Sequence, residues 1–217
     1  MNRKVYLPVL FFLSLSFMGN AQINKGSVLL GGQIYASSSV DKTGDQKNQQ
    51  NSNAAFNISV GKTVKENAVA GISLMYSPSV AKYYNNPGSS IAKTKMNQYS
   101  AGVYYRLYKN IGKDFYFFGE FGAAYIGSKS SSQDDQGNEL SSSRTSGGQL
   151  SLTPGLSYKL LKNLHLEILI PNLVDINYSV TKPSPSIAAS KQERFSFNSS
   201  LNSNGLNALG VGFRIIL

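Results

Sequence analysis

The feature that most constrains this chain is a two-residue alternation of large apolar and small or polar side chains, which returns eight times. In residues 209–217, large apolar side chains stand at every odd position, with two glycines and Arg214 among the residues between them. Successive side chains of a β-strand point to opposite faces of the sheet, so this period predicts strands, and no helical period of comparable strength occurs. The predicted strands are residues 28–36, 56–60, 68–76, 99–107, 115–125, 150–160, 164–170 and 209–217.

The connections between the predicted strands alternate between short and long. Short turns are expected near residues 62–67, 109–114 and 161–163, and long polar loops at residues 37–53, 77–96, 127–148 and 181–204. Short turns at one end and long loops at the other are typical of barrels in an outer membrane, whose spans need roughly nine to eleven residues. The predicted fold is therefore an all-β, antiparallel, up-and-down eight-stranded transmembrane barrel. Residues 194–198 alternate weakly and could pair with residues 176–180 as a hairpin projecting above the membrane, and a ten-stranded barrel is the alternative.

The composition of the two strand faces separates two kinds of barrel. A soluble, lipocalin-like barrel places its apolar side chains inside around a ligand and its charges outside. In this chain the apolar face is uniformly large and aliphatic or aromatic, as a lipid-facing surface requires, and the opposite face holds glycine, serine, glutamine and charges. A membrane barrel is therefore favoured, and a lipocalin-like periplasmic small-ligand binder is the alternative. The aromatic residues near strand ends predict an interfacial girdle: Tyr76, Tyr99, Phe115, Tyr125, Tyr158 and Tyr178.

The first 21 residues have the pattern of an export signal. Arg3 and Lys4 precede an apolar stretch at residues 5–17, and small residues, Gly19 and Ala21, stand at the −3 and −1 positions of a cut after residue 21. This pattern predicts a cleaved secretory signal peptide at residues 1–21, with the barrel domain formed by residues 22–217. No later apolar run is long enough for a transmembrane helix.

The export signal, the eight alternating strands, the short and long connections and the final segment of residues 210–217 resemble the small outer-membrane barrels of Gram-negative bacteria. The nearest type is the PorT-like outer membrane β-barrel domain group, similar in plan to the barrels of outer-membrane proteins A and X. The resemblance implies an outer-membrane location, contact with outer-membrane lipids and lipopolysaccharide, and insertion by the outer-membrane assembly machinery. It also implies a structural or interaction role, in envelope integrity, in adhesion, or beside an unidentified envelope or extracellular partner.

Composition narrows the chemistry that the chain can perform. It contains no cysteine and one histidine, His165, which excludes thiolate metal sites and cysteine nucleophiles and disfavours histidine-based metal sites and triads. His165 beside Glu167 could act as a general base, but it faces inward and no serine stands in a nucleophile elbow. We therefore expect no catalytic, metal or cofactor site. The net charge of +10 could indicate nucleic-acid binding. Because the chain is predicted to be exported, lipid headgroups are the better binding partners for its lysines.

Two groups of residues are candidates for specific roles. Charged residues on inward positions predict a polar plug in the barrel interior, with an ion gate as the alternative. These residues are Arg106, Glu120, Lys159, His165, Glu167 and Arg214. The basic and aromatic residues of the loop 77–96 predict an interaction site for lipopolysaccharide phosphates or a partner, with a solvated loop that binds nothing as the equal alternative; these residues are Lys82, Tyr83, Tyr84, Lys93 and Lys95. Separately, Pro171 with Asn172 predicts a kink in the seventh strand.

Overall fold

The computed structural model describes residues 23–85, 89–184, 191–199 and 209–217, so the predicted signal peptide lies outside the described residues. No helix in these ranges is long and apolar enough to cross a membrane. The strands are β1 (Val28–Thr43), β2 (Gln46–Lys65), β3 (Ala68–Asn85), β4 (Ser89–Asn110), β5 (Phe115–Asp134), β6 (Glu139–Leu161), β7 (Leu164–Leu169), β8 (Val174–Ser184), β9 (Gln192–Ser199) and β10 (Gly210–Ile216).

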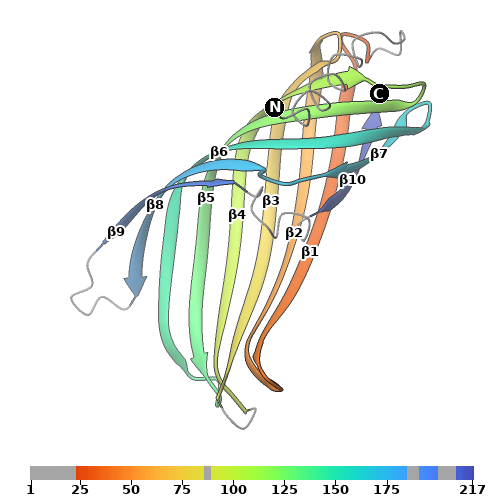
Figure 1. Ribbon diagram of the computed structural model, residues 1–217. Helices are drawn as coiled ribbons and strands as arrows, with labels where there is room; N and C mark the ends of the chain where they lie inside the picture. Colours follow the sequence, from red (N-terminus) through yellow and green to blue (C-terminus); the bar gives the residue numbers. More distant parts are fainter. Residues whose placement is uncertain (1–22, 86–88, 185–190, 200–208) are drawn as a thin grey trace, which may run out of the picture.

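The strands form one antiparallel sheet that closes on itself (Figure 1). Consecutive strands pair from β1 to β7, β7 pairs with β10, and β10 pairs with β1, where Leu29 lies opposite Ile216. This ring of eight strands confirms the predicted up-and-down barrel, and β8 and β9 extend the sheet to ten strands. At the short-turn end, closure leaves the backbone N–H and C=O groups of the ring paired, as a barrel in a membrane requires.

The seventh wall of the barrel is built from two separate strands. β7 ends at Leu169 and β8 begins at Val174; residues 155–161 of β6 pair with β7, whereas residues 142–152 pair with β8. Between them stand Pro171, which cannot donate a backbone hydrogen bond, and Asn172, which has a φ of 49°. The backbone N–H of Asn172 donates to Thr153 Oγ1 at 3.1 Å. The kink predicted at Pro171 is therefore present, as a full interruption of the strand.

The β8–β9 hairpin extends away from the rest of the barrel (Figure 1). Residues 174–181 of β8 pair with residues 192–199 of β9, so the two predicted segments do pair, with residues 176–180 opposite residues 193–197 instead of 194–198. Among the described residues, no strand pairs with the outer edge of β9, nor with the β10-facing edge of β1 beyond Ile34. The ring is therefore complete at the short-turn end and has an unpaired edge toward the opposite end.

Three of the four segments predicted as long loops are mostly strand, so this part of the prediction was wrong. β1 continues to Thr43 and β2 begins at Gln46, so residues 37–53 form a hairpin around Gly44, whose φ is 62°. Residues 77–96 and 127–148 likewise form the outer parts of β3–β4 and β5–β6. Serine, asparagine and glutamine occupy both faces there, so the apolar alternation disappears although the backbone ladder continues. Residues 181–204 are described only in part.

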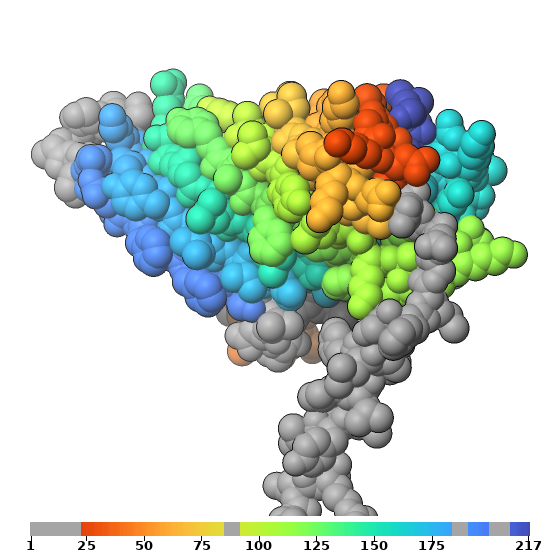
Figure 2. All heavy atoms as spheres, turned by 90° about the horizontal axis from the view of Figure 1, so that it is seen from above, coloured from red at the N-terminus to blue at the C-terminus, as the bar shows by residue number. Residues whose placement is uncertain are grey.

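The two faces of the barrel have inverted polarity. Large apolar side chains are exposed on the outer face, with Ile58 63% and Ile72 61% accessible, whereas Arg106 is completely buried inside. This distribution is that of a lipid-facing surface, and it does not supply the polar outer face that a soluble lipocalin-like barrel needs. Seen from above, the coloured atoms pack against one another without a visible channel (Figure 2).

Candidate functional site

Two arginines and two glutamates meet inside the barrel. Arg106 on β4, Glu120 on β5, Glu167 on β7 and Arg214 on β10 all occupy inward positions near the short-turn end of their strands. Glu167 Oε1 lies 2.7 Å from Arg106 Nη1 and 3.2 Å from Arg214 Nε, and Glu120 Oε2 lies 2.7 Å from Arg106 Nη2. Arg106 and Glu120 are directly opposite each other in the β4–β5 ladder, so the register itself aligns that pair.

Aromatic side chains surround both guanidinium groups. Arg106 Nη1 donates to Tyr108 Oη at 3.0 Å, and the Arg106 guanidinium lies 4.0 Å from the centroid of the Phe118 ring. Arg214 Nη1 donates to Tyr104 Oη at 3.3 Å. These contacts and the ion pairs compensate charges that are taken out of water, and the formal charges of the four ionised residues cancel. The result is a neutral, packed polar layer across the barrel, which we call the ion network.

Two inward glycines leave the space that the ion network needs. A Cβ at Gly31 on β1 would lie 2.8 Å from Arg214 Cζ and 2.7 Å from Ser59 Oγ. A Cβ at Gly61 on β2 would overlap the hydroxyl of Tyr104. Sequence reasoning did not single out these glycines, although glycine at an inward strand position is a signal that another group approaches closely.

The remaining two residues of the predicted plug lie beside the ion network. His165 is buried, shares a 3.1 Å hydrogen bond through Nδ1 with Ser157 Oγ, and stacks on Tyr116 with ring centroids 5.4 Å apart. Ser157 is also fully buried, so this Ser–His pair is not accessible to a lipid substrate. Lys159 lies opposite His165 but is half-buried and forms no ion pair with any described residue.

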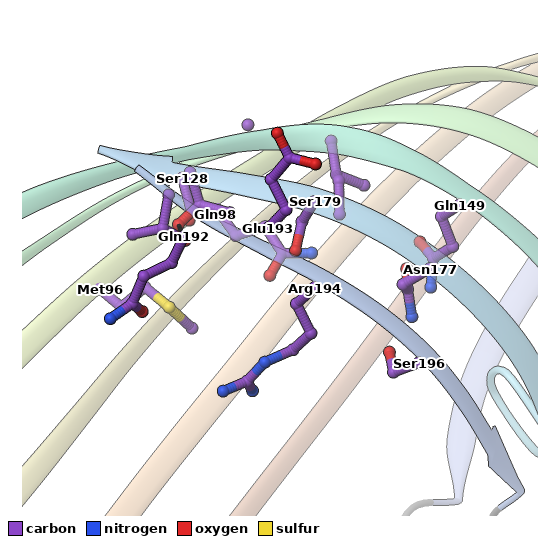
Figure 3. Close-up of a pocket in the computed structure, with 14 residues that line it drawn as sticks. Met96, Gln98, Ser128, Gln149, Asn177, Ser179, Gln192, Glu193, Arg194 and Ser196 are labelled. Carbon is purple, nitrogen blue, oxygen red and sulfur yellow. Dashed lines mark hydrogen bonds between the residues drawn. The ribbon is translucent and has the colours of Figure 1, made fainter. Parts of the chain in front are cut away.

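A polar cavity of about 740 Å³ lies further toward the long-hairpin end, between β4, β5, β6, β8 and β9 (Figure 3). Amide and hydroxyl side chains dominate its lining, and Arg194 supplies a cation, whereas the Glu193 side chain is directed to the other side of β9. Its lining includes Met96, Gln98, Ser128, Gln149, Asn177 and Arg194. Within the described ranges, no group of three or more His, Asp or Glu could hold a metal ion.

The second predicted site lies on a β-hairpin and not on a loop. Lys82 on β3 is directly opposite Lys93 on β4, and these two residues share the outer face of the hairpin with Lys95. Tyr83 is opposite Ala92 and falls on the inner face by alternation, while Tyr84 Oη donates to Gln50 Oε1 of β2 at 3.0 Å. The structure thus brings the three lysines together on one surface, with Tyr83 on the opposite face and Tyr84 bonded to β2.

The sequence matches the outer membrane protein beta-barrel domain over residues 7–214, nearly the whole chain. The chain belongs to this family. The barrel is similar to Neisserial surface protein A, with 16% identity, a TM-score of 0.44, and coverage of 88% of this chain and 97% of that one. It is also similar to the N-terminal barrel of OprF from Pseudomonas aeruginosa, with 11% identity, a TM-score of 0.48, and coverage of 89% and 98%. OprG from the same organism has 12% identity, a TM-score of 0.46, and coverage of 89% and 96%.

Family membership locates this barrel in the outer membrane, as the sequence predicted. The match identifies the general outer-membrane barrel domain and not the PorT-like group, so the PorT-like assignment stays a prediction. No curated protein matches the sequence.

Proposed function

We propose that this outer-membrane barrel is a non-enzymatic, non-conducting scaffold whose long hairpins form an interaction surface outside the membrane, serving envelope integrity, adhesion or an envelope complex. The observation that carries the proposal is the combination of a barrel interior closed by ion pairs with strands that continue far beyond the apolar band.

The ion network supports a closed interior. An eight-stranded barrel leaves room only for side chains, and here guanidinium groups and aromatic rings occupy that room. The alternative, an ion gate, requires the ion pairs of the network to break readily. Separating Glu167 from its arginines leaves buried charges without partners, which costs about 3–5 kcal/mol in comparable buried pairs. We therefore favour a plug.

The outer hairpins support an interaction role because they are ordered sheet with polar faces. Cross-strand hydroxyl contacts tie them together, at 3.0 Å between Thr94 Oγ1 and Ser132 Oγ and at 2.8 Å between Thr145 Oγ1 and Thr181 Oγ1. A surface that is already ordered loses little conformational entropy when a partner binds. Rigid polar hairpins are thus better suited to a specific contact than flexible loops.

A planar-bilayer recording combined with SDS gel mobility tests the closed interior. We expect the purified barrel to migrate differently before and after boiling, and to produce no stable conductance steps. Stable steps from the unboiled barrel would contradict the plug and favour the ion gate.

The interaction role is tested by exchanging the outer part of the β5–β6 hairpin, residues 129–144, for a short turn. A second variant replaces the same residues with a Gly/Ser segment of equal length, which keeps the length of the hairpin but not its side chains. Cells carrying either variant should become more sensitive to detergent than cells with the native hairpin, at equal barrel assembly. Unchanged sensitivity in both would contradict a role for this hairpin in envelope integrity.

A further inference from the structure

We propose that the outer face of β3, β4, β5, β6 and β8, just beyond the aromatic girdle, binds the phosphate groups of outer-leaflet lipid. This inference rests on the outer-membrane placement and deepens the proposed interaction role. Six cations form the site, which we call the cation strip. They are Lys82, Lys93, Lys95, Lys129, Arg144 and Lys182.

The strand register places like charges directly opposite one another. Lys129 of β5 lies opposite Arg144 of β6, and Arg144 lies opposite Lys182 of β8, so three cations form one row across three strands. Lys82 and Lys93 form a second such pair. Like charges directly opposite each other destabilise a sheet, so the arrangement calls for an anion from outside the chain.

The chain itself does not supply that anion. At outward positions of these strands between the girdle and the hairpin tips, no Asp or Glu occurs, and no described acid forms an ion pair with the cation strip. Two acids on neighbouring segments already have partners: Asp134 at the tip of the β5–β6 hairpin bonds Asn138, and Glu193 on β9 bonds Lys191 and Tyr178.

The position of the cation strip along the strands matches the headgroup layer. Lys129 is four residues beyond Tyr125, and Lys182 is four residues beyond Tyr178, which amounts to about 13 Å along a strand. Lys95 stands at the same spacing beyond Tyr99. With the usual tilt of barrel strands, the cations lie roughly 10 Å outside the girdle that marks the edge of the hydrocarbon.

The chemistry of the cation strip selects phosphate as its ligand. A guanidinium binds two phosphate oxygens at once, and lysines beside it add point charges to the same anion. The outward positions of β1 and β2 at the same distance beyond the girdle are neutral, for example Ser38, Val40 and Ser52, so the strip occupies one wall of the barrel. A cationic surface on one side of the barrel, at the height of the headgroups, indicates a phosphorylated lipid bound against that side. A general attraction between a positively charged protein and the membrane would not be confined to one side.

The test compares two variants that remove equal charge in a neutral detergent. The strip variant is K129Q/R144Q/K182Q, and the matched control is K25Q/K62Q/K65Q, whose lysines are exposed near the short turns. The probe is lipid A, the phosphorylated glycolipid of lipopolysaccharide, and the readout is the temperature at which the folded gel band converts to the unfolded one. Each cation near an anionic lipid surface contributes about fivefold to binding, so the strip variant should need roughly a hundredfold more lipid A for half-maximal stabilisation. The control should change less than twofold.

A second readout comes from the same gels without lipid. Because the strip variant lacks the row of like charges, it should convert at a higher temperature than the native chain in neutral detergent alone, and at a lower one with lipid A. Equal lipid A dependence in the native chain and the strip variant, or an equal loss in the control, would overturn the proposal. An equal effect of inorganic phosphate at the same phosphorus concentration would overturn the assignment to lipid.

A single-residue comparison and the scaffold readouts keep the outcomes separate. If the triple variant does not fold, Lys129→Gln against Lys62→Gln provides the same comparison, with an expected fivefold difference. The cation strip could fail to bind lipid A while the barrel still shows heat-dependent gel mobility and no conductance steps. That result would overturn the lipid site and leave the proposed scaffold function intact.

Discussion

Glu167 holds the barrel interior together through a single oxygen atom. Its Oε1 accepts from Arg106 Nη1 at 2.7 Å and from Arg214 Nε at 3.2 Å, so strands β4, β7 and β10 are tied at one point. All three side chains are buried, and the partners of the two arginines are therefore fixed by the fold.

Replacing Glu167 by Gln should test how much this atom contributes. The amide keeps the shape but removes the charge, leaving the two buried arginines with Glu120 as their anion, so we expect a loss of about 3–5 kcal/mol in the free energy of unfolding. Urea titration followed by gel mobility measures it. The control Glu193→Gln, in an exposed pair, should leave the midpoint unchanged. Equal midpoints for all three proteins would mean that Glu167 is dispensable for stability.

A methyl group at Gly31 should disturb the ion network from the opposite wall. Its Cβ would lie 2.8 Å from Arg214 Cζ, so Gly31→Ala must displace the guanidinium, at a cost of about 1–3 kcal/mol, as for overpacked cores. Gly148→Ala is the matched control, because no atom lies within 4 Å of its added Cβ. The same urea titration distinguishes them, and a Gly31→Ala midpoint equal to that of the control would contradict close packing around Arg214.

At the scale of single elements, the β5–β6 hairpin tip contains a carboxylate whose protonation should loosen it. Asp134 accepts from the backbone N–H of Asn138 at 2.7 Å and from Asn138 Nδ2 at 2.9 Å. These bonds hold the pKa of Asp134 below its ordinary value, chiefly through the side chain of Asn138. A lowered pKa means that the stabilisation is present above the unfolded-state pKa and is lost as pH falls through the folded one.

The Asn138→Ala variant should therefore move the pKa of Asp134 upward, toward its ordinary value. The carboxyl carbon chemical shift of Asp134, followed by NMR against pH in micelles, measures this directly. An identical titration in the native chain and the variant would show that the hydrogen bonds seen at the tip do not persist in solution.

The elements differ in how far sequence alone predicts them. Residues 99–107 were predicted as strand because their outward side chains face lipid, whereas the outer half of β4 was predicted as loop because both of its faces meet water. The ion network was only partly predictable. The inward charges could be read from alternation, but the contact of Arg106 with Glu167 depends on how strands far apart in the chain close around the barrel. Pro171 predicted a kink in the seventh strand, but the residues did not indicate that β6 pairs with two separate strands, β7 and β8.

At the scale of the whole molecule, the wall between β1, β10 and β7 is the shortest part of the ring. β1 and β10 pair over residues 29–34 and 211–216, whereas β4 and β5 pair over residues 92–110 and 116–134. Since fewer ladder hydrogen bonds hold β1 to β10, we expect thermal opening of the barrel to begin there.

A cysteine cross-link tests this expectation, and the chain has no native cysteine to interfere. Ile34→Cys with Val211→Cys joins β1 to β10, and Val103→Cys with Ala123→Cys joins β4 to β5 as the control. After oxidation, the first pair should raise the temperature of the gel-band conversion more than the second. Equal increases would indicate that opening does not start between β1 and β10.

The pairing of β1 with β10 also has a kinetic consequence. The two strands stand at opposite ends of the described chain, so the contact that closes the ring has the longest sequence separation of the described strand pairings. Contacts of this kind form late, because the loop-closure entropy must be overcome before they contribute any stability. Until β10 docks, β1 and β7 each present a free edge to any neighbouring strand. The lifetime of that half-closed sheet, more than the stability of the finished barrel, sets how long the chain is open to aggregation.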